Sequence, residues 1–174
     1  MATLVSKKHL VFKYFRLPTL VLILMFFALG VKSLIAANME SDESAAYANF
    51  IQNLVNKSTI SKKGAFCIFG NDPVARALKN GSRNVAISQN LDEVKSKCRA
   101  VYVSSANATK LKLYLSGMAQ GKILTISTFE EFIDNGGMIQ VEMGRRDFEL
   151  IVDVKLLHAA QIKLDTLSTN LIIN

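Results

Sequence analysis

The stretch GKILTISTFEEFIDNGGMIQVEMGRRDFELIVDV, residues 121–154, decides the fold of this chain. An apolar, largely β-branched run at 123–126 is typical of a strand buried on both faces. Alternating apolar residues then predict an antiparallel hairpin, with one strand at 138–143, a turn within 144–146 and a return strand at 148–152. The stretch therefore predicts a buried strand followed by a hairpin at one edge of a sheet.

The segment between the buried strand and the hairpin predicts a short helix. Ser127 or Thr128 can cap it, because a side-chain hydroxyl accepts a hydrogen bond from a free backbone N–H at a helix start. Glu130 and Glu131 then fall in the first turn, where the helix dipole favours negative charge. The Asn-Gly-Gly sequence at 135–137 would end the helix, since these residues tolerate positive φ at low cost.

Upstream of this stretch, helix and strand patterns alternate. Compact apolar runs indicate three strands, at 65–69, 85–87 and 99–104. Helical spacing predicts further helices at 41–55, from Asp72-Pro73 to Leu78, and at 107–115, the last one stopped by Ser116-Gly117. We therefore expect an α/β fold: a three-layer α/β/α sandwich with a mixed, mostly parallel sheet and a C-terminal antiparallel hairpin.

The N-terminus has the pattern of a secretory leader. Basic residues up to Arg16 precede an uncharged run at 17–31, which is short for a hydrocarbon layer of roughly 30 Å. Small residues Ala36 and Ala37 follow, and cleavage after either would release the chain. The sequence thus predicts a signal peptide at 1–37 and one exported domain at 38–174; an uncleaved signal anchor is the alternative.

The net charge of +7 does not indicate nucleic-acid binding. Five of the 21 basic residues lie before residue 33, whereas all 14 acidic residues follow Asn38. The remaining 16 basic and 14 acidic residues nearly cancel, and the basic residues are scattered without interleaved aromatic residues. We expect no nucleic-acid partner.

Cys67 and Cys98 are the only cysteines, and both follow the predicted leader. Disulfides persist in exported proteins, so we predict a Cys67–Cys98 bridge between two strands. Two buried free thiols are the alternative, because cysteine is among the most buried residue types.

The residues that could carry chemistry do not form a catalytic or metal-binding pattern. His158 is the only histidine beyond the leader, and the chain has no Cys-x-x-Cys or Gly-x-Ser-x-Gly sequence. The glycines at 117 and 121 do not have P-loop spacing. We therefore expect no enzyme activity, no metal and no cofactor; the 70–73 turn would be either an ordinary helix cap or a site for a small anion.

The hairpin is the candidate partner-binding element. Arg145 and Arg146 occupy its turn, beside Met138 or Met143 according to the strand register, and we place Met138 and Ile139 with them. Arginine and methionine are enriched where proteins meet, and an edge strand can accept a partner. The alternative is an ordinary solvated turn.

These motifs together resemble a known family. The Gly-Lys-x-Leu-Thr-Ile strand, the Phe-containing turn, Gly-Gly-Met-Ile and Arg-x-Phe-Glu-Leu, with a final helix, resemble the YfiR-like family of small periplasmic regulators. The resemblance runs from about Phe50 to the C-terminus and is sharpest between Gly121 and Glu149. Two features differ: Asp165-Thr166 and Ser168-Thr169 replace an expected Ser-Ser pair followed by paired leucines, and a second cysteine pair is absent.

The resemblance implies a function that composition does not. A YfiR-like protein would bind the periplasmic segment of an inner-membrane diguanylate cyclase and repress it, linking envelope or redox conditions to cyclic-di-GMP and biofilm formation. The positions of Cys67 and Cys98 match the cysteine pair whose redox state the family is thought to use. A homodimer is compatible with this reading, and the alternatives are an accessory sensor for another membrane receptor or transporter and an exported small-ligand-binding α/β protein.

Overall fold

The computed structural model describes residues 40–81, 85–87, 90–104, 108–145, 147–164 and 170–173. The chain divides into two compact units after Glu40, and the fold described below is that of the second unit, Ser41–Asn174. The predicted leader at 1–37 lies outside the described residues. Among the helices of the described ranges, none combines the length and the apolar character needed to cross a membrane.

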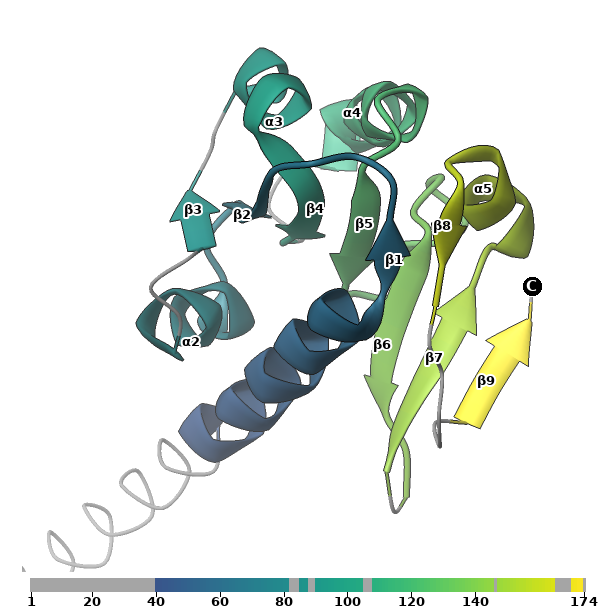
Figure 1. The fold of residues 1–174 in the computed structure, drawn as a ribbon. Coiled ribbons are helices and arrows are strands. Elements are labelled where there is room, and N and C mark those ends of the chain that lie inside the picture. Colours follow the sequence, from purple (N-terminus) through teal and green to yellow (C-terminus); the bar gives the residue numbers. More distant parts are fainter. Residues whose placement is uncertain are drawn as a thin grey trace, which may run out of the picture. The chain divides into compact units, whose positions relative to one another are not determined.

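Seven strands form one mixed, mostly parallel sheet (Figure 1). Their spatial order is β3-β2-β4-β5-β6-β7-β9, and only the β6–β7 pair is antiparallel. The bounds are β2 Ala65–Phe69, β3 Val85–Ile87, β4 Cys98–Val103, β5 Leu124–Ser127, β6 Ile139–Met143, β7 Phe148–Val152 and β9 Asn170–Ile173. The expected α/β fold with a late hairpin is confirmed.

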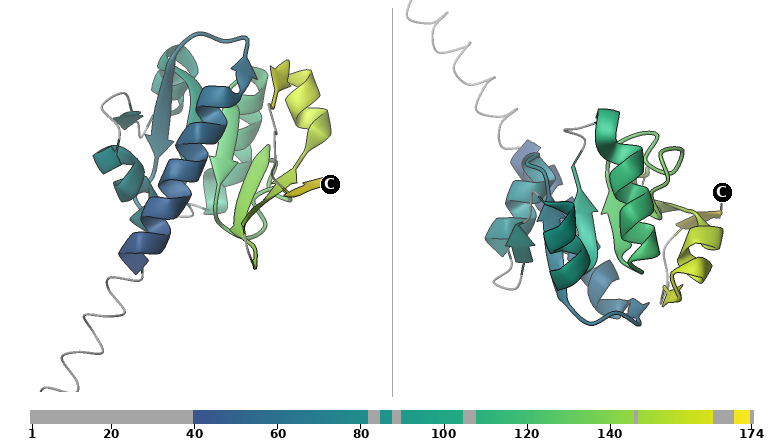
Figure 2. Two further views of the ribbon diagram at one scale, coloured as in Figure 1. Left: turned by 60° about the horizontal axis from the view of Figure 1, so that its bottom comes forward. Right: turned by 90° about the horizontal axis from the view of Figure 1, so that it is seen from above.

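Helices cover both faces of this sheet (Figure 2). One face packs against the helix of residues 40–57, α2 (Pro73–Gly81) and α5 (Val154–Ala159), and the other against α3 (Leu91–Lys97) and α4 (Ala108–Gln120). Each face of the sheet therefore has its own hydrophobic core, and successive residues of β4 alternate between them. Tyr102 points to the face with α2 and α5, and Val101 to the face with α3 and α4. A strand buried on both faces is what a central parallel strand requires.

Capping side chains define where the shorter helices begin. Asp72 precedes Pro73, the first residue of α2, and its Oδ1 accepts a hydrogen bond from the Ala75 N–H at 2.6 Å. Asn90 caps α3 and Asp153 caps α5 in the same way. Each cap satisfies a backbone donor that the helix itself leaves without a partner.

Two predictions about helices were wrong. Helix α4 does not stop at Gly117 but continues to Gln120. Gly117 lies where α3 approaches closely, because a Cβ there would be 3.1 Å from Lys95 Cε. Residues 129–136 form a series of turns instead of a short helix, and Glu131 adopts a positive φ of 64°, which interrupts helical geometry.

Three short strands were not foreseen from the sequence. β1 (Thr59–Ile60) pairs antiparallel with β8 (Ile162–Lys163) in a separate two-stranded sheet. β9 pairs in parallel with β7, so β7 is an inner strand and the hairpin does not form the edge of the sheet. Pairs this short depend on long-range contacts that local sequence patterns do not contain.

Candidate functional site

The predicted disulfide joins two neighbouring parallel strands. Cys67 on β2 and Cys98 at the start of β4 are bonded, with their Cα atoms 5.9 Å apart. Both residues are 1% exposed and belong to the core between the sheet and helices α3 and α4. A reductant therefore needs a local opening of this core before it can reach the sulfur atoms.

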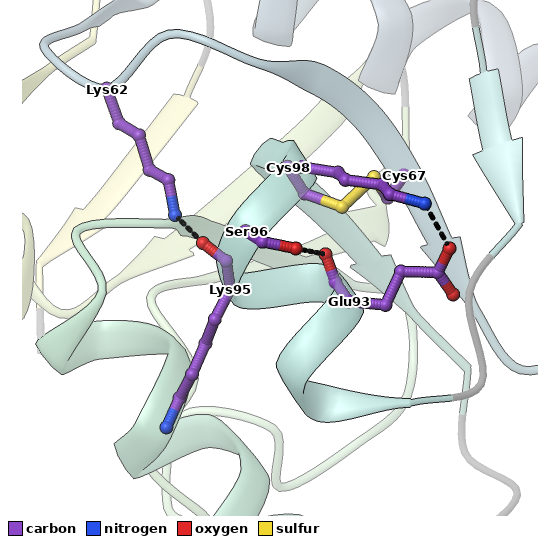
Figure 3. The surroundings of a disulfide bond; sticks show 7 residues. Lys62, Cys67, Glu93, Lys95, Ser96 and Cys98 are labelled. Atoms are coloured by element: carbon purple, nitrogen blue, oxygen red, sulfur yellow. Dashed lines mark hydrogen bonds and ion pairs between the residues drawn. A yellow bond between two sulfur atoms is a disulfide. The ribbon is translucent and has the colours of Figure 1, made fainter.

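The loop that carries Lys62 and the end of α3 lie near the bridge (Figure 3). The Lys62 Nζ donates a hydrogen bond to the Lys95 carbonyl oxygen, and burial lowers the pKa of Lys62. Gly64 follows, at a place where a Cβ would lie 2.6 Å from the Lys97 carbonyl oxygen. The 62–64 loop is thus held closely against the residues that lead into Cys98.

The hairpin tip, residues 143–148, is the exposed part of the predicted partner site. Met143 is 45% exposed, Arg145 is exposed, and Arg146 lies outside the described residues. The structure corrects the expectation for Met138 and Ile139, which are both 0% exposed. Ile139 lies in a central strand, paired with β5 on one side and with β7 on the other. A partner protein therefore cannot reach Ile139 in this conformation.

An aromatic cluster fixes the hairpin tip to the first helix. Phe148 stacks on Phe50 with ring centroids 4.4 Å apart, and it contacts Tyr47 at 5.1 Å. Burial raises the pKa of Tyr47, while a hydrogen bond to the Met143 backbone opposes that shift. The helical spacing predicted a helix at 41–55, but nothing local indicated that Tyr47 would contact a residue about a hundred positions later.

A buried polar network joins residues at or just after the carboxyl ends of β2, β4 and β5. The Tyr102 hydroxyl donates to Asp72 Oδ2 at 2.9 Å and lies 2.9 Å from Thr128 Oγ1. Tyr102 is completely buried, and this burial, more than the nearby Asp72 charge, raises its pKa strongly. Sequence reasoning missed this network because its members come from three separate segments that only the parallel sheet brings together.

The last histidine does not join these groups. His158 is exposed on α5. Within the described ranges, no three His, Cys, Asp or Glu side chains gather closely enough to hold a metal ion.

Taken together, these features describe a three-layer α/β domain with a buried disulfide and an exposed hairpin tip. A family model described as YfiR/HmsC-like matches residues 45–167. The chain therefore belongs to the YfiR/HmsC-like family, a family of periplasmic regulators.

Two solved structures are similar to this chain at low sequence identity. One is a conserved domain protein from Vibrio cholerae O1 biovar El Tor, 8% identical over 69% of this chain, with a TM-score of 0.49. The other is titled the ABC domain in complex with L-Trp from Streptococcus pneumonia, 10% identical over 74% of this chain, with a TM-score of 0.49. This chain spans 56% and 60% of those two chains. No curated protein matches the sequence.

Proposed function

We propose that this protein is an exported repressor of a membrane-bound diguanylate cyclase. It binds the periplasmic segment of the cyclase and thereby links envelope or redox conditions to cyclic-di-GMP and biofilm formation. The observation that carries the proposal is the family match over residues 45–167, which spans most of the folded unit. The predicted leader at 1–37 would deliver the domain to the periplasm, and a mature protein whose sequence still began at Met1 would contradict that step.

Repression of this kind requires binding and no chemical step. A repressor needs only to bind the inactive state of its partner more tightly than the active state, and a difference of about 1–3 kcal/mol suffices. The features that serve binding are an exposed surface on a rigid support. The hairpin tip offers both, because Met143 and Arg145 are exposed while Phe148 is held by its ring contacts to Phe50 and Tyr47.

Cyclic-di-GMP measured in a deletion strain tests the function. We expect the deletion to raise cyclic-di-GMP and surface attachment, and the wild-type gene to restore both. Unchanged cyclic-di-GMP in the deletion strain would refute the proposal.

A charge reversal tests whether the hairpin tip contacts the partner. Arg145→Glu should fail to restore repression although it folds normally, because an exposed tip charge contributes nothing to the core and a reversed charge disfavours a complementary surface. Lys110→Glu, which changes an exposed cation on α4, is the matched control and should restore repression. Crosslinking from membranes should capture the cyclase with Lys110→Glu and not with Arg145→Glu. Capture of a different membrane receptor or transporter would favour the accessory-sensor alternative.

A further inference from the structure

The carboxyl ends of β2 and β4 lie at the position where ligands bind in open parallel sheets. From β2 the chain passes to β3 on one side and then returns to β4 on the other, so the strand order reverses between β2 and β4. The connections that leave two such strands diverge, and the crevice between them is the usual ligand position in this class of sheet.

A cleft opens beside this reversal point. Its volume is about 380 Å³, and it is lined by Ile68, Gly70, Asn71, Ala75, Arg76, Lys79 and Asn80. We call it the strand-end cleft. Its volume lies within the range of small-molecule sites.

The charges that line the strand-end cleft are both positive. Arg76 and Lys79 are exposed on the same side of α2, and neither forms an ion pair within the described part of the chain. The nearest acid along the chain, Asp72, is already engaged: Oδ1 accepts from the Ala75 N–H and Oδ2 from the Tyr102 hydroxyl. The cleft therefore presents two free cations and no free carboxylate from its lining.

A buried hydroxyl without a partner in the described ranges lies against Gly70, one of the residues that line this cleft. Ser104, at the end of β4, is 4% exposed, and its Oγ is the one buried side-chain oxygen or nitrogen in the described ranges that has no hydrogen-bond partner. The Oγ points at Gly70, a lining residue, so closely that a Cβ on residue 70 would be 1.7 Å from it. An unpaired buried hydroxyl is costly, so it calls for a partner such as an ordered water, an ion or a bound ligand.

We propose that the strand-end cleft binds a small molecule bearing a phosphate group. Arg76 and Lys79 supply the charge, an arginine can contact two phosphate oxygens at once, and the Ser104 hydroxyl and the Asn71 amide supply neutral donors. Pro73 removes one backbone N–H from the start of α2, so side chains carry the recognition. This site is independent of the hairpin tip, which lies toward the other end of the strand order.

Calorimetric titration of protein purified from the periplasm tests the site. The probes are inorganic phosphate and glycerol 3-phosphate, with sodium chloride of equal ionic strength as the blank. We expect millimolar or tighter binding of at least one probe, and Arg76→Gln/Lys79→Gln should weaken it about tenfold or more, since hydrogen bonds to charged groups are the strong ones. The matched control, Lys110→Gln/Lys112→Gln on α4, should bind as the wild type does.

A second variant separates ligand binding from folding. Ser104→Ala should weaken phosphate binding while its urea midpoint stays unchanged or rises, because it removes a buried hydroxyl that has no partner in the free protein. If neither probe binds at millimolar concentration, or if Arg76→Gln/Lys79→Gln binds as tightly as the wild type, the proposed site is wrong. Neither result bears on repression of the cyclase, which the deletion strain tests by itself.

Discussion

Gly137 has no side chain at a place where an aromatic ring leaves no room for one. A Cβ on this residue would lie 2.2 Å from two ring atoms of Phe132, which is itself completely buried. Residue 137 also donates its backbone N–H to the Phe132 carbonyl oxygen at 2.9 Å, so the two residues cannot separate without losing that bond. The turn before β6 therefore requires glycine at residue 137, because no side chain fits beside the Phe132 ring.

We expect Gly137→Ala to lower the free energy of unfolding by about 1–3 kcal/mol, the usual cost of overpacking a core. Gly81→Ala is the matched control, because nothing lies within 4 Å of a Cβ at residue 81. Urea denaturation of both variants measures the effect. Equal midpoints for the two variants would show that the ring can move aside.

Tyr102 gives the fold a dependence on alkaline pH. Burial, followed by the charge of Asp72, raises the pKa of Tyr102 above its ordinary value of 10.0. In the unfolded chain this tyrosine would ionise near pH 10 and release its proton, whereas the folded protein would retain it. Because the folded state then binds more protons, stability is complete below about pH 10 and falls as the pH rises above it.

The expected slope from this one group is about 1.4 kcal/mol per pH unit above pH 10. Urea midpoints measured across alkaline pH for the wild type and Tyr102→Phe provide the test. The variant should start from lower stability, because Asp72 and Thr128 lose a hydrogen-bond partner, but its stability should fall less steeply. Parallel curves for the two proteins would mean that other groups cause the alkaline loss.

At the scale of elements, the disulfide connects two strands that the parallel sheet already places side by side. Cys98 is opposite Ala65 and Cys67 is opposite Val101 in the β2–β4 register, and the two cysteines are 31 positions apart in the chain. The loop that the bridge closes contains α2, β3 and α3. The bridge thus restricts the unfolded chain over most of the segment that leads from β2 through β3 to β4, where the strand order reverses.

Replacing both cysteines, Cys67→Ala/Cys98→Ala, should lower the free energy of unfolding by about 3–4 kcal/mol in the chain-entropy account of such a loop. Chemical denaturation of the wild type and the double variant measures this loss. In the folded wild type, a thiol reductant should act slowly, because both cysteines are 1% exposed. Two reactive thiols in denatured protein that was never reduced would show that the bridge does not form in the cell.

At the scale of the whole molecule, the two proposed binding surfaces lie toward opposite ends of the strand order. The strand-end cleft adjoins β2 and α2, whereas the hairpin tip joins β6 to β7. Between them run β4 and β5, which are buried on both faces and form the rigid centre of the domain. Variants at one surface should therefore leave binding at the other intact unless the ligand changes the central strands themselves.

The sequence alone determined the fold class, and the reasons are local. Strands β2, β4 and β5 are largely apolar runs, and the Asp72-Pro73 pair marks a helix start by its own chemistry. The alternation of Met138 to Met143 and of Phe148 to Val152 gives the hairpin. Each signal lies within a few residues, so it can be recognised without knowledge of the partner strand.

The candidate sites were only partly predictable. The cysteine pair could be predicted because the predicted leader implies an oxidising compartment, and Arg145 could be placed at an exposed turn. Met138 and Ile139 were assigned to the surface wrongly, because alternation in a hairpin does not reveal which strands will flank it. The short helix expected between the cap at Ser127 or Thr128 and the Asn-Gly-Gly at 135–137 does not form. Instead, the Phe132 N–H donates to Gln140 Oε1 at 3.0 Å, a contact from the following strand.

What only the tertiary structure decided is where distant residues meet. The pairing of β9 with β7, the contact of Tyr47 with Phe148 and the convergence of Gly70 with Ser104 all join segments that are far apart in the chain. Local propensity and periodicity carry no information about such contacts, because their stability comes from burial against elements that exist only once the sheet has formed. The sequence by itself thus determined the kind of domain this is, and packing determined which of its surfaces remain free to bind.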